Sequence, residues 1–316
     1  MTTLQKVREK APYGCDTFGR LRRVLLHRPR ALHLITRENF RQWLFDDVPD
    51  VPRFLEEHDR YRELLQSCDV EVAEVADHLN GRSDRCEFLP NLTYLHDVAV
   101  VSSRGALLSS MSTDARRGEE DVIRDVLQSL GIPLLHAFDH PEDAFEGCLL
   151  LSPETLLVAH TERHNHNAIE KFIPRALETF QEVLYVDIPR ARRFMHPDTI
   201  YNRVDHHLAL AYPPAFRRTL LYTRNDTRPV NFFELMRRRG IEIVPVSDAE
   251  QAALACSFVP LEPGVIIHYE SALSPETKKR LLQRGVELIL FSPSALLAGG
   301  GSLRCLTLRL YRESRG

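Results

Sequence analysis

The sequence predicts one α/β domain over residues 1–316, in which five strand–strand–helix–strand units surround an axis as a five-fold pseudosymmetric α/β propeller. A short strand rich in branched residues follows a helix-like segment five times, starting at residues 70, 132, 183, 241 and 286. The intervals between these starts, 62, 51, 58 and 45 residues, are regular enough to suggest repeat architecture. In addition, no linker or low-complexity stretch divides the chain. The alternative is an ordinary α/β domain whose helix-to-strand junctions look alike.

A helix is expected before each of these strands, because apolar residues recur on one face with charges opposite. In the first helix Leu55, Tyr61 and Leu64 share a side. Pro174 is unfavourable inside the third helix. The expected helices are 54–66, 122–130, 168–177, 232–239 and 277–283.

Paired apolar runs separated by turn residues predict hairpins ahead of the helices. The turns fall at Arg104-Gly105, at Pro153 and at Pro263-Gly264. A final strand is expected at Leu306–Tyr311, and surface loops at 37–52 and 225–231. The expected hairpins pair 92–101 with 106–110, 148–151 with 156–160, and 257–260 with 265–269.

Charge and composition exclude several classes of protein. The chain has 41 Lys and Arg against 44 Asp and Glu, a net charge of −3, which gives no footprint for nucleic acid or an anionic membrane. No run of 18 apolar residues occurs, and residues 1–13 do not resemble a signal peptide. The six cysteines contain no C-x-x-C pair, so we expect reduced thiols and a cytoplasmic protein.

The segment Gly299–Cys305 is a candidate nucleophile loop. Its three consecutive glycines let the backbone approach a ligand closely and deliver Cys305 at the start of an apolar strand. A cysteine reacts as its thiolate, which requires a positive or hydrogen-bonding environment. Taken alone, a buried and inert cysteine is the more common outcome.

A second candidate is Met195-His196-Pro197-Asp198-Thr199. In extended conformation His196 and Asp198 would point to the same face. His196 could then serve as general acid and base, and Asp198 could hold a cation. The alternative is a loop histidine beside a turn-forming Pro-Asp pair.

Two acids lie in apolar, strand-like surroundings: Asp97 within 92–101, and Glu146 within 144–149. Burying a carboxylate is costly unless it meets a cation, and a cationic ligand would provide one. Acids at a solvated strand end are the alternative.

We do not expect a metal site. Nitrogen and oxygen ligands could cluster, but their spacing matches no zinc signature, and histidine runs are usually solvated. These ligands are His164, His166, Asp205, His206 and His207.

Five motifs in order resemble the guanidino-modifying branch of the pentein superfamily, and the arginine deiminase family most closely. The resemblance runs over nearly the whole chain, including an opening strand at 21–29 and the segments 44–49 and 56–59. The motif-like segments are Pro90–Asp97 followed by Ala115–Arg117, Phe145–Gly147 followed by Glu162–Arg163, Met195–Thr199, and Gly299–Cys305.

The resemblance implies the five-fold propeller fold and a cysteine-dependent reaction at a guanidinium without any cofactor. Asp97 and Asp198 would grip the guanidinium nitrogens through charge-assisted hydrogen bonds. Cys305 would attack the central carbon to form a covalent thiouronium. His196 would protonate the departing ammonia and then activate water, and Glu146 would orient His196 or a guanidinium nitrogen.

The resemblance also implies a substrate-binding set. Arg116 and Arg163 would clamp the α-carboxylate and Asn91 would contact the amino-acid head, with Tyr94 and Gly300 completing the set. This implies a small guanidino compound, L-arginine or a modified free arginine, as substrate. Alternatively, the two arginines are solvated residues near helix starts.

The sequence departs from the family pattern at four positions: His96 replaces an arginine, Cys148 a glycine, Leu149 an aspartate and Arg309 a proline. The chain also lacks the helical insertion of bacterial arginine deiminases. The framework leaves an amidinotransferase open, in which an amine replaces water. A non-catalytic pentein used for binding is a further alternative, and size and family suggest a homodimer.

Overall fold

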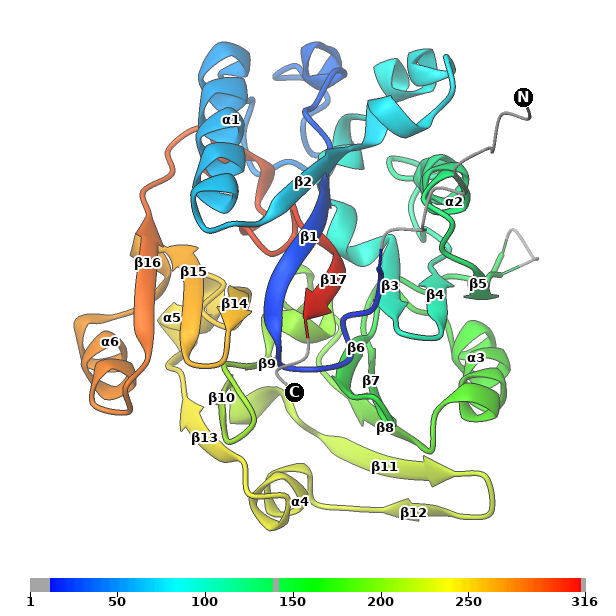
Figure 1. The fold of residues 1–316 in the computed structure, drawn as a ribbon, viewed down its shortest axis with the longest axis vertical. Helices are drawn as coiled ribbons and strands as arrows, with labels where there is room; N and C mark the ends of the chain where they lie inside the picture. The colour runs from blue at the N-terminus through cyan, green and yellow to red at the C-terminus, as the bar shows by residue number, and fades with distance from the viewer. Residues whose placement is uncertain (1–11, 139–141, 314–316) are drawn as a thin grey trace, which may run out of the picture.

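The computed structural model describes residues 12–138 and 142–313. Within these residues the chain forms five separate sheets, which follow one another around the molecule in Figure 1. Each sheet contains an antiparallel pair of strands and a third strand parallel to the second of that pair. A helix connects the two parallel strands in every unit. The predicted order of strand, strand, helix and strand therefore recurs five times in the described chain.

The first unit takes one strand from each end of the chain. Its strand β1 (Arg20–Leu26) pairs antiparallel with β17 (Leu308–Glu313) and parallel with β2 (Glu71–Glu74), which follows α1 (Val51–Ser67). The C-terminal strand thus completes the sheet that the N-terminal strand begins. Figure 1 shows this sheet, in blue and red, near the middle of the view.

The other four units lie in chain order, and the sheet of the third is extended by two further antiparallel strands, β11 and β12. A short helix, α5 (Asp248–Ala252), precedes the fifth unit. The remaining elements are β3 (Ala99–Ser102), β4 (Gly105–Leu108), α2 (Glu119–Ser129) and β5 (Leu134–His136); β6 (Leu149–Ser152), β7 (Thr155–His160), α3 (His166–Thr179) and β8 (Glu182–Asp187); β9 (Tyr201–Arg203), β10 (Leu208–Ala211), β11 (Arg218–Thr223), β12 (Thr227–Pro229), α4 (Phe232–Arg238) and β13 (Glu242–Pro245); β14 (Val259–Glu262), β15 (Val265–Tyr269), α6 (Pro275–Leu282) and β16 (Glu287–Phe291).

The repeated junction between helix and strand has a local cause. Gly131, Gly240 and Gly285 follow α2, α4 and α6 with φ of 74°, 73° and 77°, and Asp69 takes the same left-handed conformation after α1 with φ of 59°. A left-handed residue ends a helix and redirects the chain at little cost when it is glycine. The recurring sequence phrase therefore marks a real structural junction in four of the units.

Helix starts are fixed by side-chain caps. Asp50, Asn165, Asn231 and Ser274 each accept a hydrogen bond from a backbone N–H in the first turn of α1, α3, α4 and α6. Such caps satisfy donors that the helix itself leaves free. α3 (His166–Thr179) continues through Pro174, so the proline does not interrupt it as its sequence position suggested.

The core joins neighbouring sheets. One buried apolar cluster combines side chains of β1 and α1, such as Val24 and Phe54, with Ile267 of β15 and Phe291 of β16. The first and fifth sheets therefore share a core and hold each other in place.

The structure corrects three local expectations. Most of 92–98 is not a strand: it forms 3₁₀ turns over Pro90–Thr93 and Leu95–Asp97, and the hairpin strand begins at Ala99. The segment 225–231 is not only a loop, because it contains β12. Asp198 lies in a 3₁₀ turn, Pro197–Thr199, while His196 alone is extended.

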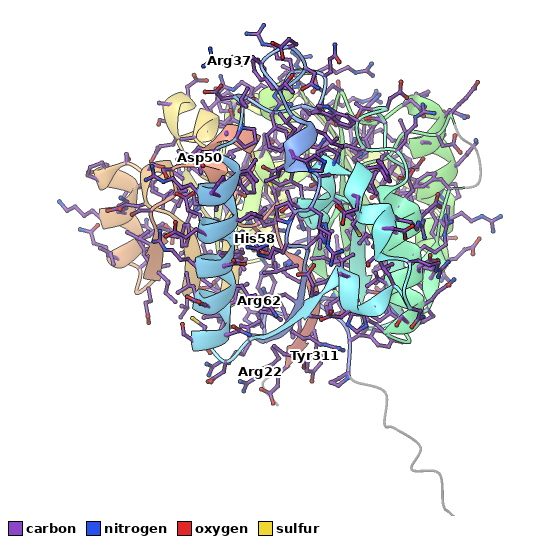
Figure 2. All side chains as sticks on the ribbon, turned by 90° about the horizontal axis from the view of Figure 1, so that it is seen from above. Arg22, Arg37, Asp50, His58, Arg62 and Tyr311 are labelled. Carbon is purple, nitrogen blue, oxygen red and sulfur yellow. The ribbon has the colours of Figure 1, made fainter. Side chains whose placement is uncertain are left out.

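The segment that precedes α1 and the labelled residues of the first sheet lie at opposite ends of the molecule (Figure 2). Figure 2 places Arg37 and Asp50, in and after the loop that precedes α1, at one end, and Arg22 of β1 and Tyr311 of β17 at the opposite end. No helix among the described residues is long and apolar enough to span a bilayer.

Candidate active site

Most of the predicted site residues line one cavity, although they come from segments far apart in the sequence. The cavity also receives Leu44 from the loop before α1. The predicted residues in its wall are Asn91, Tyr94, Asp97, Arg116, Arg163, His196, Gly300 and Cys305. The other two, Glu146 and Asp198, are buried behind this wall and contact residues beside it.

Cys305 lies in the loop between a 3₁₀ turn at Leu296–Gly299 and β17. Its Sγ lies 3.4 Å from Oγ of Ser302, and its backbone N–H donates to the same hydroxyl at 3.3 Å. Burial, together with the charges of Asp198 and Asp97, raises the pKa of the Cys305 thiol to about 12. Without a bound cation the thiol is therefore protonated at neutral pH.

The three glycines before Cys305 make room for an aromatic ring. A Cβ placed on Gly299 would lie 1.6 Å from the hydroxyl oxygen of Tyr94, and one on Gly301 would lie 2.5 Å from a ring carbon of Tyr94. Gly300 has φ of 70°, and its Cβ would meet Asp46 at 2.5 Å. A side chain at Gly299 or Gly301 would displace Tyr94 from the cavity wall, and one at Gly300 would displace Asp46, so the glycines fix the path of the loop that carries Cys305.

His196 is held between two carboxylates. Its Nδ1 lies 3.1 Å from Oδ1 of Asp97, and its Nε2 lies 3.0 Å from Oε2 of Glu146. Burial opposes ionisation of Glu146, but the hydrogen bond with His196 and the charges of Arg116 and Arg163 hold its pKa well below the usual range. Glu146 is therefore ionised, and its carboxylate contacts the imidazole of His196.

Asp97 lies in the 3₁₀ turn Leu95–Asp97 and not in a strand. Burial raises its pKa, and the charges of His196 and Arg116 oppose that rise. Its Oδ2 accepts a hydrogen bond from Nη1 of Arg116 at 3.1 Å. Asp97 thus meets a protein guanidinium in this structure.

Asp198 keeps one oxygen free. Its Oδ2 accepts from the Ser257 hydroxyl at 2.9 Å and lies 3.5 Å from Nε of Arg304, whereas its buried Oδ1 has no hydrogen-bond partner. A buried carboxylate oxygen without a partner is costly. A cationic N–H donor entering the site would satisfy it.

Arg116 and Arg163 are equally buried, but their guanidinium groups have different partners. Arg116 donates to Asp97, to Glu119 at 2.9 Å and to the Tyr94 carbonyl at 2.8 Å. Nη1 of Arg163 has no hydrogen-bond partner and lies 3.7 Å from Oε2 of Glu146. Arg163 is therefore the arginine whose donor is available to a carboxylate, whereas the donors of Arg116 are already engaged.

Asn91 braces the cavity wall. Its Nδ2 donates to the carbonyl of Trp43 at 2.9 Å and to that of Ala115 at 3.3 Å. These bonds tie the loop before α1 to the segment that carries Arg116. The amide nitrogen of Asn91, the residue expected to contact the amino-acid head, is thus engaged with the backbone.

One of the residues that depart from the family pattern, His96, lies beside the site. Nε of Arg304 donates to Nε2 of His96 at 3.1 Å, and burial with the charges of Arg304 and Arg309 lowers the pKa of His96 well below its usual value. His96 is therefore a neutral acceptor. Leu149 and Arg309 line a different cavity, treated below.

Among the residues that the structure describes, one group of three side chains could hold a metal ion: Asp97, His196 and Asp198, whose ligand atoms lie within 4.8 Å of one another. The same two carboxylates are those expected to grip a guanidinium. The residues weighed from the sequence as ligands form no such group in the described chain: His166 pairs with Glu170, and Asp205 accepts from backbone N–H groups.

Several contacts were not predicted. Arg192 lines the cavity and pairs with Asp46 at 3.0 Å, and Ser257 and Arg304 hold Asp198. Ser302 and Arg304 belong to the motif Gly299–Cys305, so their proximity to Cys305 could be predicted from the sequence. No sequence signal marks Arg192 or Ser257, because only the folded arrangement brings them to the site.

Comparison with known proteins places the chain in a family. A family model described as arginine deiminase matches residues 83–312. The chain is similar to arginine deiminase of Mycoplasma capricolum, 25% identical over 390 aligned residues that cover 93% of this chain and 96% of that protein. Because 390 aligned positions exceed the 316 residues here, that relative has segments without a counterpart in this chain.

Solved structures share the fold. The N-terminal domain of ArgZ, an arginine dihydrolase from the ornithine–ammonia cycle in Cyanobacteria, superposes with a TM-score of 0.69 at 19% identity, covering 92% of this chain and 97% of that chain. AgrE in complex with ornithine and NAD+ gives a TM-score of 0.69 at 19% identity over 93% of this chain. The chain spans only 40% of the AgrE chain.

Proposed function

The chain belongs to the arginine deiminase family of guanidino hydrolases, and from this premise we propose that it converts L-arginine, or a modified free arginine, to citrulline and ammonia (or an amine). The observation that carries the proposal is the shared cavity: Cys305 and His196 line it, and behind its wall Asp198 has one oxygen without a partner. A nucleophile, a proton carrier and an anionic grip for a cation are the three elements that guanidine hydrolysis requires.

In the proposed mechanism the substrate guanidinium lies between Asp97 and Asp198, which accept hydrogen bonds from its nitrogens. The bound cation lowers the pKa of Cys305, the thiol proton passes to His196, and the thiolate attacks the central carbon. The carbon–nitrogen bond then breaks, and ammonia leaves with a proton from His196. His196 next removes a proton from water, which attacks the thiouronium carbon. Cleavage of the carbon–sulfur bond releases citrulline and restores Cys305.

The preference for an α-amino acid follows from Arg163. Its buried Nη1 has no partner and lines the same cavity as Cys305, so a substrate carboxylate would satisfy it. Planar guanidinium groups suit carboxylate recognition. We propose Asn91, Tyr94, Arg116 and Gly300 as the remainder of the substrate-binding wall, with Arg116 acting through Asp97.

We further infer that the five sheets are the blades of one propeller and that the chain is a single domain. Support comes from the unit repeated in all five sheets, from the β1–β17 pairing of the chain ends and from the core shared by the first and fifth sheets. A homodimer remains a prediction from size and family.

The test is product analysis. Purified protein is incubated with L-arginine, and citrulline and ornithine are measured by mass spectrometry for the wild type, Cys305→Ala and the matched control Cys68→Ala. Citrulline from the wild type and from Cys68→Ala, with none from Cys305→Ala, would support the hydrolase and its nucleophile. Full turnover by Cys305→Ala would refute the mechanism.

The same assay separates the alternatives. Added glycine or lysine would divert product from citrulline only if an amine resolves the intermediate, as in an amidinotransferase. Absence of turnover together with no labelling of Cys305 by a haloacetamidine would instead indicate a binding protein.

A further inference from the structure

A second cavity shares no lining residue with the first, and four arginine side chains contribute to its wall. Its volume is about 20 Å³, which is room for one water-sized particle. This cavity receives Asp16 and Phe18 from the segment before β1, whereas the first cavity receives Leu44 from the loop before α1. Figure 2 shows Arg37 of that loop and Arg22 of β1 at opposite ends of the molecule. The arginines in its wall are Arg203, Arg304, Arg309 and Arg312.

These guanidinium groups are held almost entirely by neutral acceptors. Arg312 donates to the carbonyls of Gly19, at 2.8 Å, and Pro260, and Arg203 donates to the carbonyl of Leu151 at 2.8 Å. Arg304 donates to the neutral ring of His96. Nε of Arg309 is buried and has no hydrogen-bond partner.

Nearby acids compensate only part of this charge. Asp16 lines the cavity but accepts hydrogen bonds from Ser103, with its Oδ2 2.7 Å from the Ser103 hydroxyl, and Asp198 lies 3.5 Å from Arg304. The charge of Asp205 also acts on Arg203, so four arginines face three carboxylates, which leaves 4 − 3, or one, uncompensated positive charge. The Cys15 thiol does not help, because burial raises its pKa to about 11 and keeps it neutral.

Uncompensated buried charges are expensive, and the cost shows in the arginines themselves. Burial and the charge of Arg309 lower the pKa of both Arg304 and Arg312 to about 9. An anion among these groups would remove the repulsion and satisfy the free donor of Arg309.

We propose that this second cavity binds a small monatomic inorganic anion, of the size of chloride, between Arg309 and its neighbouring arginines. The cavity volume excludes larger oxyanions, and the free Nε–H of Arg309 supplies the donor. Through Arg304, which contacts both the cavity and Asp198, the anion would balance the charge beside the catalytic carboxylate.

Two positions where the chain departs from the family pattern meet in this cavity. Leu149 lines it where the family pattern has an aspartate, and Arg309 lines it where the pattern has a proline. Relative to that pattern, the cavity wall lacks a carboxylate and contains an additional guanidinium. A bound anion would substitute for the fixed charge that residue 149 lacks.

The first test measures thermal unfolding at a constant 0.2 M total salt while sodium chloride replaces sodium gluconate, whose anion is too large for the cavity. We expect chloride to raise the Tm of the wild type by about 3 °C relative to Arg309→Gln. The matched control Arg228→Gln, which removes an exposed cation, should respond as the wild type does. Equal responses of the wild type and Arg309→Gln would overturn the proposal.

A second variant introduces a fixed negative charge into the wall of the second cavity. Leu149→Asp supplies a carboxylate in the cavity wall, so its Tm should no longer depend on chloride. If either variant fails to fold, wild-type crystals soaked in sodium bromide decide the question by anomalous diffraction. A bromide peak within hydrogen-bond distance of Arg309 supports the site, and a cavity that contains only water refutes it.

Discussion

Arg116 and Arg163 show how two arginines with equal burial acquire different roles from their partners. The guanidinium of Arg116 is engaged by Asp97, Glu119 and a carbonyl oxygen, so it fixes the carboxylate of Asp97. Nη1 of Arg163 is buried without a partner. Only Arg163 can accept a new anionic partner without losing existing bonds, although their positions in the sequence suggested the same function for both.

Replacement of the two arginines should therefore affect different kinetic constants. Arg163→Gln should raise the KM for L-arginine roughly ten- to a hundredfold with kcat little changed, because a charge-assisted hydrogen bond to the carboxylate is lost. Arg116→Gln should mainly lower kcat by releasing Asp97. Steady-state kinetics with L-arginine and with agmatine, which has no carboxylate, measure this. An equal loss on both substrates for Arg163→Gln would contradict the assignment.

The raised pKa of Cys305 predicts a reagent-dependent reactivity. A folded pKa of about 12 means that the thiol stays protonated at pH 7–9, and the thiolate fraction rises only as the pH approaches that value. Neutral iodoacetamide should thus label Cys305 slowly at pH 7.5. A cationic chloroacetamidine should label it faster, because the amidinium binds Asp97 and Asp198 and lowers the thiol pKa.

Peptide mass spectrometry of labelling rates between pH 7 and pH 10 provides the measurement, with Cys68 as the internal control. Cys68 is partly exposed and has no role in the cavity, so it should show no preference for the cationic reagent. Rapid labelling of Cys305 by iodoacetamide at neutral pH would show that the thiolate exists without a cation.

At the scale of elements, the loop that carries Cys305 depends on glycine for space. Gly301→Ala would bring a methyl group within 2.5 Å of the Tyr94 ring, which is buried and cannot move freely. We expect kcat/KM to fall at least about a hundredfold, because misplacing a reacting group by an ångström costs that much. Gly285→Ala, where nothing lies within 4 Å, serves as the control and should reduce stability without a comparable loss of activity.

Helices and strands could be predicted where the residues that determine them are adjacent in the sequence. Each junction glycine follows its helix and precedes branched residues, so Gly131, Gly240 and Gly285 could be read from the sequence. Asp97 could not be placed correctly, because the apolar run 92–101 resembles a strand and its 3₁₀ turns depend on tertiary contacts such as the bond from the His96 N–H to the Cys305 carbonyl at 3.0 Å. A short edge strand, β12, is likewise formed through pairing with β11 rather than through its own residues.

At the scale of the molecule, the site is assembled from nearly the full length of the chain, from Leu44 to Cys305. The repeated unit explains why motifs far apart in sequence meet: the sheets follow one another around the molecule, and the segments that leave them contribute to one cavity. Resemblance to a family singled out the acids, the histidine and the cysteine, and the structure brings these side chains close together. The partners of Arg116 and Arg163 and the arginine cavity were not predictable, because they depend on which side chains face each other after folding.

The buried thiols make the whole fold sensitive to alkali. Burial raises the pKa of Cys15 and Cys86 to about 11 and that of Cys148 to about 12, above the value of 9.0 for a free thiol. Between about pH 9 and pH 11 the unfolded chain loses these protons while the folded chain keeps them. The folded state then binds more protons, so the free energy of unfolding must fall as pH rises, by about 1.4 kcal/mol per pH unit for each thiol.

Cys148→Ala tests this linkage, because it removes one buried thiol outside both cavities. Its free energy of unfolding at pH 8 should be lower than that of the wild type, since buried volume is lost. Between pH 9 and pH 11 it should decline less steeply, by about 1.4 kcal/mol per pH unit. Val158→Ala, in the same core cluster but without a titratable group, should keep the wild-type slope. Urea unfolding at half-unit pH steps gives the slopes, and identical slopes for the two variants would show that Cys148 ionises equally in both states.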